Sequence, residues 1–152
     1  MFKKQGLYNP EFEHENCGAG FICNLNGKKT NQIIHDALEI LIKLKHRGGV
    51  SSDGVTGDGA GLLIDIPHTY FKKVCDFKLP EERKYAVGML FIPKNQTAYF
   101  RNIFSKEIEK QGLNIIGWRK VPVISSFLGK IALKSEPISE QIFIEKPKNI
   151  SE

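Results

Sequence analysis

The sequence has few cysteines and no long apolar segment. Its 152 residues include three cysteines, Cys17, Cys23 and Cys75, without a Cys-x-x-Cys pair or a matching histidine spacing. This arrangement argues against a disulfide framework and a structural zinc site. No apolar run approaches the roughly 20 residues of a membrane helix, and the first residues lack the apolar centre of a secretory signal. We predict a cytoplasmic protein without membrane association. Any cysteine with a functional role is expected to act as a free thiol.

The composition is that of an ordinary soluble domain, with 26% charged and 41% hydrophobic residues. The length allows one compact domain with a core and excludes two large domains. The net charge of +5 is dispersed along the chain. The sequence has no RNP-like aromatic pattern, zinc finger or helix-turn-helix, so we predict no nucleic-acid partner.

The first sixteen residues form no periodic pattern. They mix charge with Gly6 and Pro10, which is typical of a tail or a detachable leader. Order is expected to begin at Cys17. The apolar residues 21–25 predict a buried strand that ends in a hairpin-type turn at Asn26-Gly27. Cys17 would then lie at the start of this strand.

An amphipathic helix is predicted over residues 31–46, where apolar side chains recur at steps of three and four. Basic residues crowd its end before Gly48-Gly49. Arg47 is therefore expected at the end of the helix, next to the loop of residues 48–61, which reads GGVSSDGVTGDGAG. Such a loop is expected to need positive φ angles or close backbone approach at several glycines, which connecting loops rarely require.

The remaining chain predicts a scaffold of mixed strands and one long helix. Strands are expected over residues 62–67, 85–92, 113–116, 121–124 and 141–144, and a helix over residues 99–108. Gly117-Trp118-Arg119 is expected to be a kink between two strands. Without strict βαβ alternation, a layered arrangement with a mainly antiparallel sheet fits best.

Two further cysteines and two histidines, which are potentially reactive, are expected to have structural roles. We predict that Cys23 and Cys75 fill the core and that His35 and His68 have structural roles. Residues 145–152 follow a strand without an obvious closing element, so a truncated or split product is expected.

The string GDGAG over residues 57–61 resembles phosphate-binding loops only superficially. A dinucleotide fingerprint requires a strand, a glycine turn and then a helix, whereas here a helix precedes and a strand is expected to follow. No Gly-Lys-Ser or Gly-Lys-Thr follows, and Val55 stands where an EF-hand requires an oxygen ligand. We therefore predict no nucleotide or metal site here.

Cys17 is the stronger candidate for chemistry. A thiol near neutral pH is mostly protonated and needs a base, but no suitable base is adjacent in sequence. His14 is too close along the chain, and His46 could approach only through the fold. If the leader is removed, the α-amino group of Cys17, with a pKa of about 7.7–8.0, can serve as that base. A buried structural cysteine remains the competing interpretation.

A set of short motifs resembles the glutamate synthase large subunit, whose N-terminal domain is a class II glutamine amidotransferase and an N-terminal-nucleophile hydrolase. The resemblance runs from Tyr8 to about Ile144 in the same order. The motifs are CGAGF at 17–21, LKHRGG at 44–49, TGDGAG at 56–61, IPH at 66–68, GWR at 117–119, VPV at 121–123, LG at 128–129 and EP at 136–137.

The resemblance implies an α+β fold, a four-layer αββα sandwich that is incomplete in this chain. It implies a leader of residues 1–16 and the N-terminal part of the amidotransferase domain over residues 17–152. Cys17 would attack the side-chain amide of L-glutamine and release ammonia, which the whole enzyme uses to convert 2-oxoglutarate to glutamate. No cofactor is expected in this segment. FMN and an iron-sulfur cluster are implied for the full-length enzyme, and the implied partners are its remaining domains and a small reductase subunit or ferredoxin.

The resemblance also implies roles around the nucleophile. Arg47 would support its pocket, although a helix C-cap charge is the alternative. The residues expected to shape the loop around the pocket are Gly48, Asp53, Thr56, Gly57, Asp58, Gly59 and Gly61. Asp58 could tie loop amides or touch substrate.

One departure from the family pattern leaves the function open. The oxyanion-hole Asn-Gly pair and the groups that grip the glutamine α-amino and α-carboxylate have no match before Glu152. Losing one oxyanion donor costs about 10²–10³ in rate. The chain is therefore expected to be part of a glutaminase, a non-catalytic fragment of one, or part of another class II amidotransferase.

Overall fold

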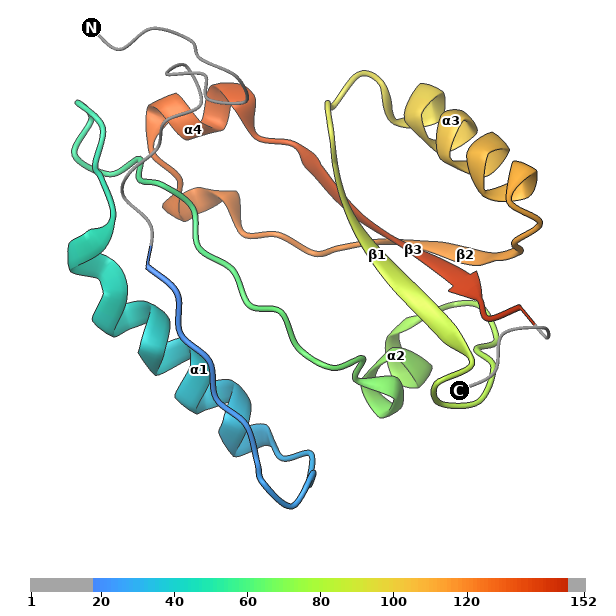
Figure 1. The fold of residues 1–152 in the computed structure, drawn as a ribbon. Coiled ribbons are helices and arrows are strands. Elements are labelled where there is room, and N and C mark those ends of the chain that lie inside the picture. Colours follow the sequence, from blue (N-terminus) through green and yellow to red (C-terminus); the bar gives the residue numbers. More distant parts are fainter. Residues whose placement is uncertain (1–17, 148–152) are drawn as a thin grey trace, which may run out of the picture. The chain divides into compact units, whose positions relative to one another are not determined.

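The structure, a computed structural model, describes residues 18–147 and combines helices with a small antiparallel sheet (Figure 1). The chain divides into two compact units, residues 1–63 and residues 64–152. This mixture of helix and strand is consistent with the α+β class and with part of a class II amidotransferase domain. Across the described residues, none of the helices is long and apolar enough to cross a membrane.

The first unit is organised by helix α1, Asn31–Lys43, which the 3₁₀ turn η2, Leu44–Arg47, extends. Together they confirm the predicted helix and its end at Arg47. Residues 18–25 lie along this helix and run in the opposite direction. A Cβ atom added to Gly18 would lie 3.2 Å from a methyl carbon of Leu44, and one added to Gly20 would lie 2.6 Å from Cγ2 of Ile40. The extended segment is therefore packed closely on the helix.

The predicted strands at residues 21–25 and 62–67 are not formed. Neither segment pairs with a strand among the described residues, and both are extended chain. Phe21 is 91% exposed and Leu63 is 102% exposed. A strand exists only when its backbone donors and acceptors meet those of a neighbour, which an apolar pattern alone does not supply. The turn at Asn26-Gly27 is confirmed, because the Gly27 N–H donates to Asn24 O over 2.9 Å.

The second unit contains an antiparallel sheet with the strand order β1-β3-β2, as the sequence predicted in outline. The strands are β1, Tyr85–Ile92, β2, Ile115–Lys120, and the central β3, Ile138–Glu145. The predicted strand at residues 113–116 is confirmed in part, since β2 begins at Ile115, but the predicted break at residues 117–119 is wrong because these residues belong to β2. The predicted strand at residues 121–124 is not formed. The register of β2 against β3 shifts between Ile115 and Gly117, as at a β-bulge or a similar irregularity.

Helices lie on both faces of this sheet. Helix α3, Thr97–Lys110, confirms the predicted long helix. The short elements α2, His68–Val74, η3, Ser125–Phe127, and α4, Lys130–Ser135, were not predicted. Glu140 and Phe143 on β3 point to opposite faces because side chains alternate along a strand. Since α3 contacts Glu140 and α2 contacts Phe143, the two helices cover different faces.

The aromatic core gathers around Phe143, which is fully buried. Its ring lies 5.0 Å from that of Phe71 in a perpendicular arrangement and 5.1 Å from that of Phe77. Tyr85 completes the cluster, and its hydroxyl lies 3.0 Å from Nδ1 of His68. These contacts confirm the structural role expected of His68.

An ion pair anchors α3 on the other face. Glu140, which is 3% exposed, accepts two hydrogen bonds of 2.7 Å from Nε and Nη2 of Arg101. The guanidinium also lies over the Trp118 ring, 5.2 Å from its centre. The fork geometry of arginine allows one side chain to satisfy the carboxylate and stack on an aromatic face.

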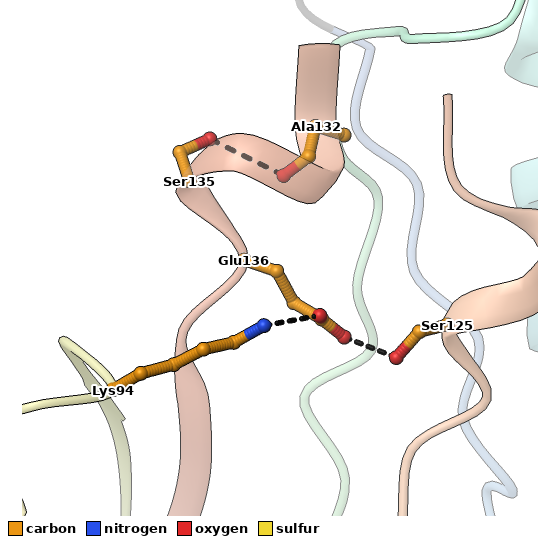
Figure 2. Close-up of polar contacts among 5 residues, drawn as sticks. All are labelled: Lys94, Ser125, Ala132, Ser135 and Glu136. Atoms are coloured by element: carbon orange, nitrogen blue, oxygen red, sulfur yellow. Dashed lines mark hydrogen bonds and ion pairs between the residues drawn. The ribbon is translucent and has the colours of Figure 1, made fainter. Parts of the chain in front are cut away.

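A smaller polar cluster joins three segments of the second unit (Figure 2). Glu136, which follows α4, accepts a 2.7 Å hydrogen bond from Nζ of Lys94 and a second one from the Ser125 hydroxyl. These two donors, Lys94 first, lower the pKa of the Glu136 carboxyl below its usual value. The Glu-Pro motif at 136–137 therefore begins with a residue that ties distant parts of the chain together.

Candidate active site

Cys17, the predicted nucleophile, lies outside the described residues, which begin at Gly18. Gly18 follows Cys17 directly, and a Cβ atom added to Gly18 would lie 3.2 Å from Cδ of Arg47. The arginine side chain thus lies against the backbone that continues from the cysteine. Arg47 is exposed at the end of η2.

The loop after Arg47 folds into a short hairpin. Val50 and Gly57 form an isolated antiparallel bridge, and the Ser51 N–H donates to Thr56 O over 2.7 Å. A second backbone bond, from Gly54 N–H to Ser51 O, closes the tip over 2.9 Å. Gly54 has φ of 69°, a left-handed conformation that favours glycine. The loop is therefore locally ordered although its composition is that of a flexible linker.

Asp53 holds the tip of this hairpin. Its Oδ1 accepts from the backbone N–H groups of Val55 and Thr56 over 3.1 and 2.8 Å. Its Oδ2 accepts from the Thr56 hydroxyl over 2.6 Å. Asp53 and Thr56 are both half-buried. Aspartate is suited to this position because its short carboxylate reaches amides two and three residues ahead.

Asp58 ties the base of the hairpin. Its Oδ2 accepts a 2.8 Å hydrogen bond from the Gly49 N–H, nine residues earlier. Between the alternatives left open by the sequence, the observed contact is the loop amide. A side chain at Gly57 would be tight beside it, since an added Cβ would lie 3.2 Å from Gly49 O. Gly49 was not among the predicted site residues. The sequence feature that could have indicated it is the Gly48-Gly49 pair that follows the predicted helix.

The remaining glycines of the loop differ from Gly57. Gly48 donates to Lys45 O over 3.2 Å and closes η2. A Cβ added to Gly59 or Gly61 would meet no described atom within 4 Å, and neither has a positive φ. Of the expected special geometry, the positive φ is found at Gly54 and the close backbone approach at Gly57, and residues 59–61 lie in no helix or strand.

The two described cysteines differ in environment. Cys75 is partly buried and packs against the core cluster, and burial raises the pKa of its thiol. The prediction that Cys23 also fills the core is wrong, because Cys23 is exposed. The reason is the missing strand: residues 21–25 have no neighbour to cover this side chain. An exposed thiol close to Cys17 matters for any labelling experiment.

The other candidate groups do not form a second reactive centre. His46 places Nδ1 2.8 Å from Lys43 O, and a carbonyl can only accept, so this ring nitrogen carries the proton. Arg119 donates to Oε1 of Gln141 over 2.8 Å and to the Tyr70 hydroxyl over 3.3 Å. In residues 18–147, no three His, Cys, Asp or Glu side chains are placed to hold one metal ion.

Comparison with known proteins identifies the class. The sequence profile of the glutamine amidotransferases class-II matches residues 17–152. The chain therefore belongs to this family.

The relatives point to one branch of that family. The chain is 46% identical over 149 residues to the NADPH glutamate synthase large chain of Bacillus subtilis, covering 95% of this chain and 10% of the relative. It is 44% identical over 144 residues to the NADH glutamate synthase of Saccharomyces cerevisiae, covering 88% and 7%. It is 39% identical over 136 residues to the chloroplastic ferredoxin-dependent glutamate synthase 2 of Arabidopsis thaliana, covering 84% and 8%. The chain thus spans a tenth or less of the length of these relatives, and the matches confirm its resemblance to an N-terminal glutamate synthase domain.

Proposed function

We propose that this chain forms the nucleophile-bearing part of the glutaminase domain of a glutamate synthase. The observation that carries the proposal is the close approach of the Arg47 side chain to Gly18, the residue after Cys17, where an added Cβ would lie 3.2 Å from Cδ of Arg47. An arginine side chain beside the chain that leaves the cysteine fits a pocket for a polar substrate such as L-glutamine. The hairpin braced by Asp53 and Asp58 would form the adjoining wall.

In the proposed reaction the leader of residues 1–16 is removed and Cys17 becomes the N-terminus. Its α-amino group accepts the thiol proton, and the thiolate attacks the side-chain amide carbon of glutamine. The tetrahedral intermediate expels ammonia, which takes up a proton, and leaves a γ-glutamyl thioester. Water then hydrolyses the thioester to glutamate and regenerates the thiol.

Arg47 and the hairpin would act on binding and orientation in this scheme. Arg47 would hold the pocket beside the nucleophile, and Asp53, Thr56 and Asp58 would keep the loop in one conformation. Preorganisation of this kind accelerates a reaction because the groups need not reorganise as charge develops. Gly48, Gly57, Gly59 and Gly61 would leave room for the substrate along the loop.

The complete domain is proposed to be the four-layer αββα sandwich of N-terminal-nucleophile hydrolases, and the enzyme is proposed to act in the cytoplasm. In that enzyme, FMN would supply electrons for the reductive amination of 2-oxoglutarate, with a reductase subunit or ferredoxin as their source. The iron-sulfur cluster is proposed to belong to other domains of that enzyme. The reductive half of the reaction is not assigned to this segment.

The proposal is tested by labelling the complete enzyme from its native host with a diazoketone analogue of glutamine. We expect N-terminal sequencing to begin at Cys17 and peptide mass spectrometry to place one adduct there, with protection by L-glutamine. Cys23→Ser is the matched control, because Cys23 is exposed and can react without binding the analogue.

Two results would overturn the assignment. One is an adduct that persists in Cys17→Ser while it is lost in Cys23→Ser. The other is a glutaminase-active enzyme whose N-terminus is Met1, because the α-amino group of Cys17 would then be in a peptide bond.

A further inference from the structure

The sequence contains three pairs in which an asparagine or aspartate precedes glycine: Asn26-Gly27, Asp53-Gly54 and Asp58-Gly59. In such pairs the glycine nitrogen can attack the preceding side-chain carbonyl carbon and close a five-membered succinimide. Glycine favours the attack because no Cβ obstructs the approach. The structure distinguishes these three pairs, since ring closure requires a side chain that is free to rotate toward the next nitrogen.

Both aspartates are held away from this reaction. Asp53 accepts three hydrogen bonds, from two backbone N–H groups and the Thr56 hydroxyl, at 2.6–3.1 Å. Asp58 is fixed by the Gly49 N–H at 2.8 Å. Rotation of either carboxylate would break charge-assisted hydrogen bonds. An ionised carboxylate is also a poorer electrophile than a neutral carboxamide.

Asn26 is different in each respect. It is exposed in the turn between residues 18–25 and α1. Its backbone N–H donates to Oδ1 of Asn24 over 2.9 Å, whereas no hydrogen bond to its carboxamide is found among the described residues. Gly27 is uncrowded, because a Cβ placed there would meet nothing within 4 Å. The side chain therefore has both the freedom and the space to rotate.

We propose that Asn26-Gly27 is a spontaneous deamidation site of this protein. The Gly27 nitrogen forms a bond to Cγ of Asn26, and the side-chain nitrogen leaves as ammonia after taking up the proton lost by Gly27. One water molecule then opens the succinimide at either carbonyl and gives aspartate or isoaspartate. The reaction needs only water, and the formal net charge falls from +5 by one.

Asn24 controls the rate in this proposal. The Gly27 N–H donates to Asn24 O over 2.9 Å, and Oδ1 of Asn24 also accepts from the Lys28 N–H over 3.4 Å. The glycine nitrogen must lose its proton to attack, so a turn that occupies this N–H slows the reaction. Loosening the turn would expose the nitrogen and speed the loss of ammonia.

The product would alter the first unit at a sensitive place. Isoaspartate adds one carbon to the main chain in the turn that joins residues 18–25 to α1. Gly20 lies so close to Ile40 that the segment has little room to shift along the helix. Deamidation would thus displace the chain that continues from Cys17, although the chemistry at Asn26 does not depend on the proposed glutaminase function.

The test is to incubate the purified chain at neutral and mildly alkaline pH and follow each asparagine by peptide mapping. Isoaspartyl methyltransferase labelling identifies the rearranged product. We expect modification to accumulate at Asn26 well before Asn95 or Asn114, which precede larger residues. Asn26→Gln should remove the signal, because the longer side chain must close a less favourable ring.

Asn24→Ala provides the structural arm of the experiment. The alanine keeps the carbonyl that accepts from the Gly27 N–H but removes the Oδ1 that accepts from the Asn26 and Lys28 N–H groups. The turn should therefore loosen, and deamidation should become about 2- to 10-fold faster. Circular dichroism checks that each variant keeps its helices. The proposal is overturned if Asn26 deamidates no faster than Asn95, or if isoaspartate arises first at Asp53 or Asp58. An unchanged rate in Asn24→Ala would refute the control assigned to the turn.

Discussion

The carboxylate of Asp58 accepts a hydrogen bond from the backbone N–H of Gly49, and these two residues flank the Val50–Gly57 bridge from outside. The bond joins the residue before the bridge to the residue after it. It thereby fixes the loop next to Arg47 through a single side chain. In the proposed glutaminase, this loop would form the wall beside the nucleophile.

Replacing Asp58 with alanine should loosen the base of the hairpin. Since one exposed hydrogen bond is worth about 0.5–1.5 kcal/mol, amide exchange at Gly49 should become about 2- to 10-fold faster. Asp58→Asn is the matched control, because its carbonyl oxygen can still accept from the same N–H. Equal exchange rates in the wild type and the alanine variant would show that the carboxylate does not hold the loop.

The Arg101–Glu140 pair should respond asymmetrically to mutation. Arg101→Met leaves a carboxylate that is 3% exposed without its bidentate donor, whereas Glu140→Gln leaves an arginine that is 40% exposed and can reach water. We expect Arg101→Met to cost about 3 kcal/mol, at the low end for breaking a buried pair, and Glu140→Gln to cost about 1 kcal/mol. Trp118 is the only tryptophan, so its fluorescence in urea follows this unit directly.

The reverse order would contradict this assignment. If Glu140→Gln were the more damaging change, the carboxylate would be stabilised by groups other than Arg101. A double variant then separates the pair from its surroundings, because the coupling energy isolates their mutual interaction.

Elements stabilised by local spacing could be predicted from the sequence. The apolar residues of α1 recur with the helical period, and β1 is a continuous apolar run, so both elements could be recognised from the sequence. Arg47 at the end of η2, which extends α1, was predicted for the same reason. The short helix α2 was not, since seven residues are too few to display a period.

Errors arose where the outcome depends on contacts distant in sequence. Cys23 lies in an apolar run that predicts a buried strand, but burial requires a neighbour that the run itself cannot specify. Gly117 predicts a break, yet pairing with Phe143 on β3 carries the strand through it. Likewise, the hydrogen bond from the Gly49 N–H to Asp58 could not be predicted from the sequence, because it depends on the hairpin that brings the two residues together.

Glu136 should make stability depend on pH. Hydrogen bonds from Lys94 and Ser125 lower the pKa of its carboxyl in the folded state. A lowered pKa contributes stability that is fully present above the unfolded value of about 4.3 and is lost as the pH falls through the lower folded value. The gap in urea midpoint between the wild type and Glu136→Gln should therefore shrink from about pH 6 to about pH 3.

Glu107→Gln is the control for general effects of acid. Glu107 pairs with Lys110 on the exposed surface of α3, where such pairs contribute little. Its variant should follow the wild type at every pH. A midpoint gap for Glu136→Gln that stays constant across this range would show that ionisation of Glu136 is not linked to folding.

Gly117→Ala should destabilise the second unit by overpacking. An added Cβ would lie 2.5 Å from Cδ1 of Phe77, whose ring packs 5.1 Å from that of Phe143. Forcing the ring aside should cost about 1–3 kcal/mol in urea unfolding followed by Trp118 fluorescence. The double variant with Phe77→Leu tests the cause, because a smaller side chain removes the clash. We expect the alanine to cost less in that background, whereas an undiminished cost would assign the effect to the β2 backbone.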